Sequence, residues 1–291
     1  MKLATYADGS RDGHLVVVAA DLETAHYAAP GVSRLQALLD DWNFLSPQLE
    51  DLAATLDGGR ARHAMAFDPA LARAPLARPP RCVRQCTGGS QVEEPAWFAG
   101  ARLLGEPRGL GWAWQPHLAI VTADLPWGAD AGRATEAIRL IGWAVRVGAQ
   151  RMEPDQEPLA PGAWHFAPLL ATPGSLAEVG PGWTWRLTPK GEQGPLRLSR
   201  SARAGGAAGA GAGDAGWPAL AAMGDLLAEA ARRAPLPAGT LMLLPLAEPA
   251  IDNALTDGAL GWSLSLVDPR GDAPLGEVVF AARGTEPPEP A

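Results

Sequence analysis

Short apolar runs separated by turn residues characterise the beginning of the chain. Alternation of apolar and polar side chains predicts β-strands over residues 2–6, 14–19 and 24–27. The pairs Asp8-Gly9 and Asp12-Gly13 supply residues that favour tight turns between the first two strands. The chain is therefore expected to begin with a small β-rich unit.

Two helices are expected next, because leucines then recur at helical spacing. We expect Ser33 to cap a helix over residues 34–42. Ser46 is expected to cap a second helix with Pro47 at its first position, which Gly58-Gly59 would end. Three strands and two helices would together form a compact unit over about the first 70 residues.

Proline and alanine dominate residues 69–80, which mark the best domain boundary. We predict an N-terminal cap domain over residues 1–73 and a larger domain over 74–291, of an α+β, mostly β class. Residues 204–213 are expected to form a mobile Gly/Ala loop, and 285–291 a frayed tail. The larger domain's expected elements are strands at 118–121, 183–187, 240–244, 261–267 and 276–281, a helix at 217–233, and a helix running into a strand over 131–147.

Charge and cysteine usage exclude several classes of function. Lys and Arg number 24 against 32 Asp and Glu, a formal net charge of −8, so nucleic-acid binding is not expected. No apolar run is long enough for a membrane span, and no signal peptide is recognised. Cys82 and Cys86 are the two cysteines, which excludes a disulfide framework and favours a reducing, cytoplasmic location.

Candidate catalytic motifs are weak when they are judged from the residues alone. Ser90 lacks the glycine that would complete a nucleophile elbow, and the Cys82/Cys86 pair has no partner pair for a metal. The five histidines show no metal-ligand spacing, and the strands near residues 118 and 145 carry no carboxylate. Eleven tryptophans are compatible with a ligand groove, but core packing is the commoner use of such side chains.

The first part of the chain nevertheless carries a dense set of recognisable residues. These are Met1-Lys2-Leu3-Ala4-Thr5-Tyr6, Asp8-Gly9-Ser10-Arg11-Asp12-Gly13, Thr24-Ala25-His26-Tyr27, Leu39-Asp40-Asp41-Trp42-Asn43-Phe44, Ser46-Pro47-Gln48-Leu49 and Phe67-Asp68-Pro69. The run resembles the N-terminal cap of the fumarylacetoacetate hydrolase family over about residues 1–78. A weaker resemblance continues to about residue 281, through Leu118-Ala119-Ile120-Val121-Thr122 and Asp124-Leu125-Pro126-Trp127-Gly128.

The resemblance implies a mixed β-roll in the larger domain and a dimeric assembly. Family members use Mg²⁺ or a similar ion to hold a diketo or oxo acid for C–C bond hydrolysis or decarboxylation. This chain departs from the family pattern at every ligand, base and pocket-closing position that can be aligned. At the degenerate positions it has Arg84, Gln91, Gln115, His117, Arg146 and Pro161.

These departures remove four carboxylate ligands and introduce two arginines, which repel a cation. We therefore expect no catalytic residue of the family type, no metal site and no cofactor. The leading interpretation is a catalytically inactive pseudoenzyme with a binding or regulatory role, as a homodimer or a heteromer with an active relative. Its pocket would be filled by Trp112, Trp114, Trp143 and Trp164.

Two other interpretations stay open. A metal-free enzyme or carboxylate-binding protein would hold a small carboxylate ligand with Arg84 and Arg146, and His117 would act as acid or base. An ordinary hydrolase of diketo acids would require a different alignment in the larger domain. If no anion is bound, the two arginines are expected to face solvent or to pair with Glu93 or Glu94.

Overall fold

The computed structural model describes residues 1–86, 89–93, 102–104, 112–149, 163–176, 179–189, 216–247 and 261–281. The predicted loop at 204–213 and the predicted tail at 285–291 lie outside them. The helices are α1 (Leu35–Asp40), α2 (Trp42–Asp57), α3 (Ala131–Glu136) and α4 (Leu220–Ala231), with the short 3-10 turns η1 (Pro30–Val32), η2 (Pro69–Leu71) and η3 (Pro173–Ser175). None of the described helices is long and apolar enough to span a membrane.

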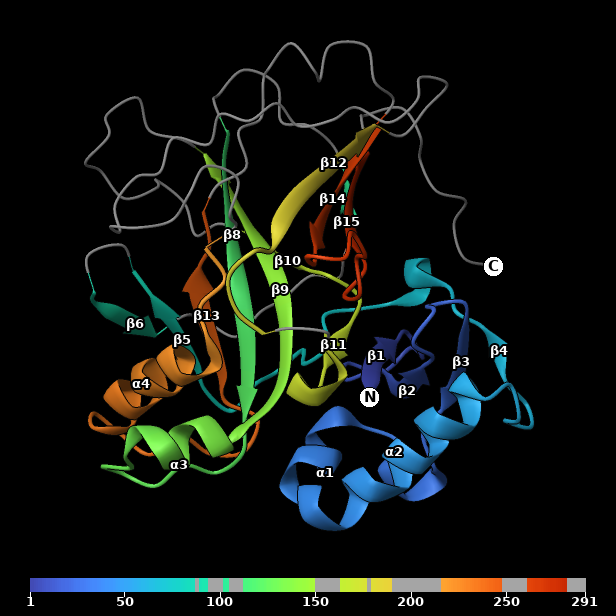
Figure 1. The fold of residues 1–291 in the computed structure, drawn as a ribbon, viewed down its shortest axis with the longest axis horizontal. Helices are drawn as coiled ribbons and strands as arrows, with labels where there is room; N and C mark the ends of the chain where they lie inside the picture. Colours follow the sequence, from blue (N-terminus) through green and yellow to red (C-terminus); the bar gives the residue numbers. More distant parts are fainter. Residues whose placement is uncertain are drawn as a thin grey trace.

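Most of the regular secondary structure in the described chain is β-strand, in two sheets (Figure 1). The 11-stranded mixed sheet has the order β4-β3-β2-β1-β11-β9-β8-β13-β5-β6, with β10 paired to β9, and the second sheet has the order β12-β14-β15-β7. The strands are β1 (Lys2–Tyr6), β2 (His14–Val18), β3 (Thr24–Tyr27), β4 (Met65–Ala66), β5 (Cys82–Gln85), β6 (Gln91–Glu93), β7 (Arg102–Leu104), β8 (Trp112–Thr122), β9 (Ile138–Ala149), β10 (Ala163–Phe166), β11 (Leu170–Ala171), β12 (Thr184–Pro189), β13 (Leu241–Pro245), β14 (Gly261–Val267) and β15 (Glu277–Ala281). The predicted α+β, mostly β class is confirmed.

The N-terminal strands are continuous with the larger sheet. β1 pairs with β2 on one edge and with β11 on the other, where Leu3 lies opposite Leu170. Apolar residues from both sides of this junction share one core, including Leu38, Phe166 and Leu241. The predicted boundary at residue 73 therefore falls within a chain whose two parts share a sheet and a core.

The two N-terminal helices begin at other positions than expected. Arg34, and not Ser33, precedes α1, because the Ser33 carbonyl oxygen accepts the Leu15 backbone N–H and ends η1 instead. The second helix begins at Trp42, so Ser46 and Pro47 lie inside it. Ser46 is buried, so this part of α2 is fixed by packing and not by a side-chain cap.

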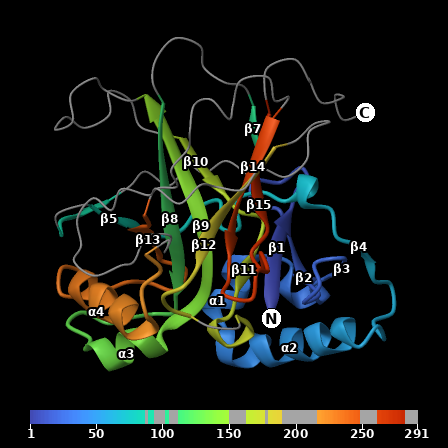
Figure 2. The ribbon, with the colours of Figure 1, turned by 45° about the horizontal axis from the view of Figure 1, so that its top comes forward.

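The predicted switch from helix to strand after residue 131 is confirmed. α3 ends at Glu136, and β9 begins at Ile138 and runs through the centre of the large sheet. Figures 1 and 2 show α3 beside α4, near one end of β8 and β9. The two helices meet closely at Gly224, where a Cβ would overlap the Thr135 side chain.

Successive residues of the central strands β8 and β9 point to opposite faces of the sheet. Leu118, Ile120 and Trp143 enter the core that contains residues of α3, α4 and the second sheet. Ala119 and Ala144 enter the core shared with α1 and α2. Whether a residue stands at an odd or an even position along its strand, here called its parity, thus fixes the face on which it lies. This decides where each candidate site residue lies.

Candidate functional site

Four of the six candidate residues lie on one face of the large sheet. Gln115 of β8 lies directly opposite Arg146 of β9, and His117 follows two residues after Gln115 on the same face. Arg84 of β5 reaches this face through β13, where Leu243 lies opposite both Arg84 and Ala119. We refer to Arg84, Gln115, His117 and Arg146 as the arginine–histidine patch.

His117 is the buried centre of this patch, with 2% of its surface exposed. Its Nδ1 lies 2.8 Å from the Gln115 carbonyl oxygen. A carbonyl oxygen only accepts, so Nδ1 carries the proton and donates it. The imidazole packs edge-on against Trp164 of β10, with ring centroids 4.7 Å apart.

Burial, with a smaller contribution from the charges of Arg84 and Arg146, lowers the pKa of His117 to about 3. The hydrogen bond to the Gln115 carbonyl opposes the shift. His117 is therefore neutral at neutral pH and does not serve as an acid there. The charges of Arg84 and Arg146 thus both act on the same imidazole.

The predicted partner of the arginines is engaged elsewhere. Glu93 lies opposite Val83 and accepts a hydrogen bond from Arg81 Nε at 2.7 Å, so the expected pairing with Arg84 or Arg146 is wrong for Glu93. Strand alternation is the physical reason, because Glu93 and Arg84 occupy opposite faces of the β5–β6 pair. Arg84 Nη1 instead lies 3.3 Å from the Cys86 Sγ, a contact that the sequence did not indicate. Glu94 lies outside the described residues.

The structure separates the other candidates from the patch. Gln91 lies opposite Gln85, and its side-chain amide donates to the Leu226 carbonyl oxygen of α4 at 3.3 Å, which places it on the other face. Pro161 lies outside the described residues.

Of the four tryptophans expected to fill the pocket, Trp164 lies at the patch. Trp143 belongs to the opposite core and packs against Trp185, with ring centroids 5.3 Å apart, so its expected role is wrong. Its parity along β9 decides this. The side chains of Trp112 and Trp114 are not among those described.

The residues of the patch do not fit a hard metal ion. Mg²⁺ and Mn²⁺ prefer carboxylate and other oxygen donors, whereas the patch offers one amide, one imidazole and two cationic guanidinium groups. Within the described part of the chain, no group of three or more His, Cys, Asp or Glu side chains is arranged to hold a metal.

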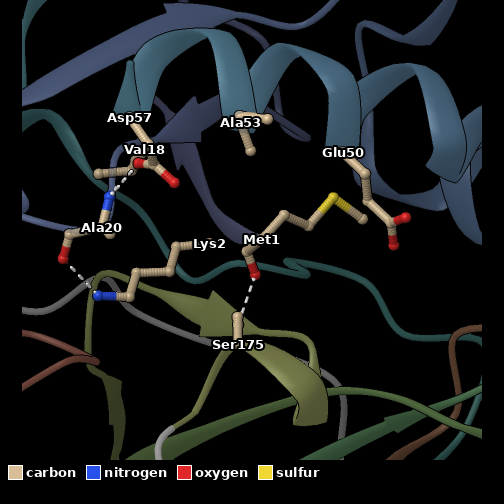
Figure 3. Close-up of a pocket in the computed structure, with 9 residues that line it drawn as sticks. Met1, Lys2, Val18, Ala20, Glu50, Ala53, Asp57 and Ser175 are labelled. Atoms are coloured by element: carbon tan, nitrogen blue, oxygen red, sulfur yellow. Dashed lines mark hydrogen bonds between the residues drawn. The ribbon is translucent and has the colours of Figure 1, made fainter. Parts of the chain in front are cut away.

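A cavity of about 250 Å³ lies away from the patch, between α2, the start of β1 and η3 (Figure 3). Lys2, Val18 and Ser175 line it together with Glu50 and Asp57 of α2. This cavity was not predicted from the sequence. The scarcity of lysine in the chain was the available signal.

Comparisons with known proteins agree with the resemblance. Residues 1–78 match the family model "Fumarylacetoacetase N-terminal domain 2". The maleylpyruvate hydrolase of Sphingobium sp. SYK-6, solved in complex with manganese (II) ion and pyruvate, is 14% identical, with a TM-score of 0.59 over 97% of this chain and 98% of that one. The fumarylacetoacetate hydrolase of Exiguobacterium antarcticum is 14% identical, with a TM-score of 0.63 over 98% and 100%.

A probable 2-hydroxyhepta-2,4-diene-1,7-dioate isomerase of Mycobacterium abscessus is similar as well. It is 15% identical, with a TM-score of 0.62 over 99% of this chain and all of that one. No curated protein sequence matches the chain. Residues 1–78 thus match a fumarylacetoacetase N-terminal domain, and the described part of the chain has the fold of these hydrolases and isomerases.

Proposed function

We propose that this protein is a catalytically inactive relative of the fumarylacetoacetate hydrolases that acts as a binding or regulatory partner. The observation that carries the proposal is the arginine–histidine patch. Two guanidinium groups and a neutral, buried imidazole occupy sheet positions that the sequence resemblance assigns to metal ligands. A site of this charge repels the cation on which the family's chemistry depends.

The chemistry is tested with the purified protein, Mn²⁺ or Mg²⁺, and either fumarylacetoacetate or an acylpyruvate. We expect no stoichiometric metal binding in calorimetry and no cleavage above a control without protein. A one-to-one micromolar metal site that His117→Ala abolishes, or measurable C–C bond hydrolysis, would contradict the proposal. That result would favour an active hydrolase of diketo or oxo acids.

A binding role is also supported by two large exposed side chains. Trp127 is 71% exposed, yet its indole N–H donates to the Arg232 carbonyl oxygen at 3.0 Å, which fixes its orientation. Phe44 of α2 is 67% exposed. Tryptophan is enriched among the residues that contribute most to the affinity of protein interfaces.

We propose a homodimer, or a heteromer with an active relative, as the assembly. Light scattering of the full chain measures the first, and co-purification with a co-expressed active relative measures the second. Trp127→Ala and Phe44→Ala are expected to weaken the complex that forms. A monomer that binds no relative would contradict this part of the proposal.

A small-carboxylate site is the second candidate, because Arg84 and Arg146 both act electrostatically on the same imidazole. Arginine binds carboxylates through paired hydrogen bonds. In thermal melts, a ligand with a dissociation constant near ~100 μM would add about 1.4 kcal/mol at ~1 mM. Pyruvate, oxaloacetate and sulfate are suitable probes.

An Arg84→Ala, Arg146→Ala double variant should lose any such stabilisation. The metal-free enzyme interpretation requires the two arginines to hold its substrate. His117 is neutral at neutral pH and supplies no acid group to such an enzyme. If none of the three anions raises the melting temperature of the unmodified protein, the small-carboxylate candidate fails and the binding-partner proposal remains.

A further inference from the structure

Lysine is rare in this chain, which makes the position of Lys2 informative. All but two of the 24 basic side chains are arginine, and the lysines are Lys2 and Lys190. Arginine stays charged in proteins, whereas a buried lysine can lose its proton and become a nucleophile. Lys2 as a residue is 7% exposed, and its amine makes a hydrogen bond at a partly buried position.

Lys2 also lines the cavity of about 250 Å³ (Figure 3). Its Nζ donates to the Ala20 carbonyl oxygen at 2.7 Å, which holds the amine at the wall of the cavity. Val18 and Ala53 supply apolar walls, and Glu50 and Asp57 supply carboxylates from α2. The volume is at the small end of ligand sites and suits a molecule of a few carbon atoms.

Burial lowers the pKa of the Lys2 ammonium. The carboxylates of Asp57, Asp21, Asp272 and Asp268 oppose the shift without cancelling it. A larger fraction of this amine is therefore neutral at pH 7 than of an ordinary lysine. The neutral amine is the form that attacks carbonyl carbon.

We propose that Lys2 is a reactive amine that captures a small, uncharged aldehyde or ketone from this cavity as an imine. The Nζ lone pair forms a bond to the carbonyl carbon, and proton transfer from nitrogen to oxygen gives a carbinolamine. Loss of one water molecule then gives the C=N bond, with no oxidant or reductant required. Glu50 and Asp57 disfavour an anionic ligand in the same space.

This site differs from the arginine–histidine patch in position and in charge preference. The patch would select carboxylates, whereas the Lys2 cavity would select carbonyl compounds without a negative charge. Failure at one site therefore leaves the proposal at the other untouched.

The test uses the full chain, propionaldehyde and cyanoborohydride at pH 7, followed by tryptic peptide mapping. Alkylated Lys2 blocks cleavage after residue 2, so the peptide 1–11 replaces the peptide 3–11. Reaction at the Met1 α-amine leaves that cleavage intact and is counted separately. A synthetic peptide of residues 1–11 provides the same lysine without the fold.

We expect Lys2 to react at least fivefold faster in the protein than in the synthetic peptide. Lys2→Arg should abolish the blocked cleavage site. An equal or slower rate in the protein would show that burial merely shields Lys2, and would overturn the proposal.

Access through the cavity is tested with Ala54→Leu, which narrows the cavity from α2 and leaves Lys2 itself unchanged. The matched control is Ala222→Leu, at an exposed alanine of α4 remote from the cavity. Ala54→Leu should reduce labelling of Lys2 at least fivefold and the control should not, with both variants folded by circular dichroism. Equal labelling of the two variants would exclude the cavity as the route.

Charge preference is tested by replacing propionaldehyde with glycolaldehyde or glyoxylate. Glycolaldehyde is neutral and should label Lys2 at least threefold faster than anionic glyoxylate, relative to their rates with the peptide. A faster relative rate for glyoxylate would overturn the proposed selectivity.

Discussion

The two faces of β8 and β9 differ in what they contribute to the molecule. On one face, Leu118, Ile120 and Trp143 are buried in an apolar core with residues of α3, α4 and the second sheet. On the other face, the apolar residues Ala119 and Ala144 are followed by the polar patch. The same two strands therefore carry both the structural core and the candidate site.

The contrast indicates which substitutions the fold tolerates. Changing a residue of the apolar face removes buried surface and leaves a cavity, which costs several kcal/mol. Changing a residue of the arginine–histidine patch alters the charge and hydrogen bonding of the site and leaves most of the packing in place. Solved structures that are 13–15% identical to this chain share its fold over nearly the whole length, as this division leads one to expect.

The largest expected effect is on the apolar face. Trp143→Ala should lower the free energy of unfolding by about 3–5 kcal/mol, because a fully buried indole is removed from the central core. Arg84→Ala is the comparison on the polar face and should cost less than ~1 kcal/mol. Urea unfolding measures both, and equal losses would contradict the division between the faces.

On the polar face, His117 should make the free energy of unfolding depend on pH. The unfolded pKa is about 6.5, and the folded pKa is about 3. Below the unfolded pKa the unfolded state binds the proton and the folded state does not. The free energy of unfolding is therefore not reduced by His117 above pH ~6.5. It falls as the pH drops towards ~3, by about 2 kcal/mol at pH ~5.

His117→Phe should remove this loss between pH 7 and 5, as measured by urea unfolding at each pH. The control is His63→Asn, at an exposed loop position with φ of 62°, where asparagine is well tolerated. In the control, the free energy of unfolding should change with pH as steeply as in the original protein. An unchanged slope in His117→Phe would show that His117 is accessible to protons in the folded state.

A smaller effect is expected where the N-terminal helices meet the larger sheet. Gly239 has φ of 86°, and a Cβ there would overlap the Gln36 amide, which donates to the Ala238 carbonyl oxygen at 3.0 Å. Gly239→Ala should cost about 1–2 kcal/mol through backbone strain and loss of this hydrogen bond. Gly271→Ala has a similar φ of 93° with open space around it and separates strain from contact. If the two variants lose equal stability in thermal melts, the contact with Gln36 contributes nothing to the stability of the protein.

The smallest effect is expected at the surface. Glu229 of α4 and Arg233, which follows the end of this helix, form an exposed i,i+4 ion pair with an N···O distance of 3.2 Å. Glu229→Gln should reduce stability by about 0.5 kcal/mol or less, and added salt should reduce the difference. Arg233 Nη1 also donates to the Gln91 carbonyl oxygen of β6 at 3.4 Å. A loss above ~1 kcal/mol in urea unfolding would show that the ion pair supports this hydrogen bond.

Much of the fold was predictable because the signals are local. The strands at residues 2–6, 24–27 and 261–267 were placed correctly from alternation and turn residues. The expected helix running into a strand over residues 131–147 is also observed. The start of α2 was misplaced, because packing of its buried face outweighed the serine and proline signals at residues 46 and 47. Helix ends depend on such competition and are less predictable than the helices themselves.

The candidate site was predicted in part. Arg84, Gln115, His117 and Arg146 were expected together, and they share one sheet face. Gln91 and Trp143 were expected with them and lie on the opposite face. A list of neighbouring positions does not fix parity, because one residue of register moves a side chain across the sheet.

By itself, the sequence determined the class of fold, the N-terminal resemblance and the loss of carboxylates from the central strands. These properties follow from residue types and their periodicity, which are local to the chain. The tertiary structure alone decided that Arg81 pairs with Glu93, that His117 is buried beside Trp164, and that Lys2 lines a cavity. Each depends on strand pairing or helix packing between distant segments, and the burial that shifts a pKa exists only once those segments have met.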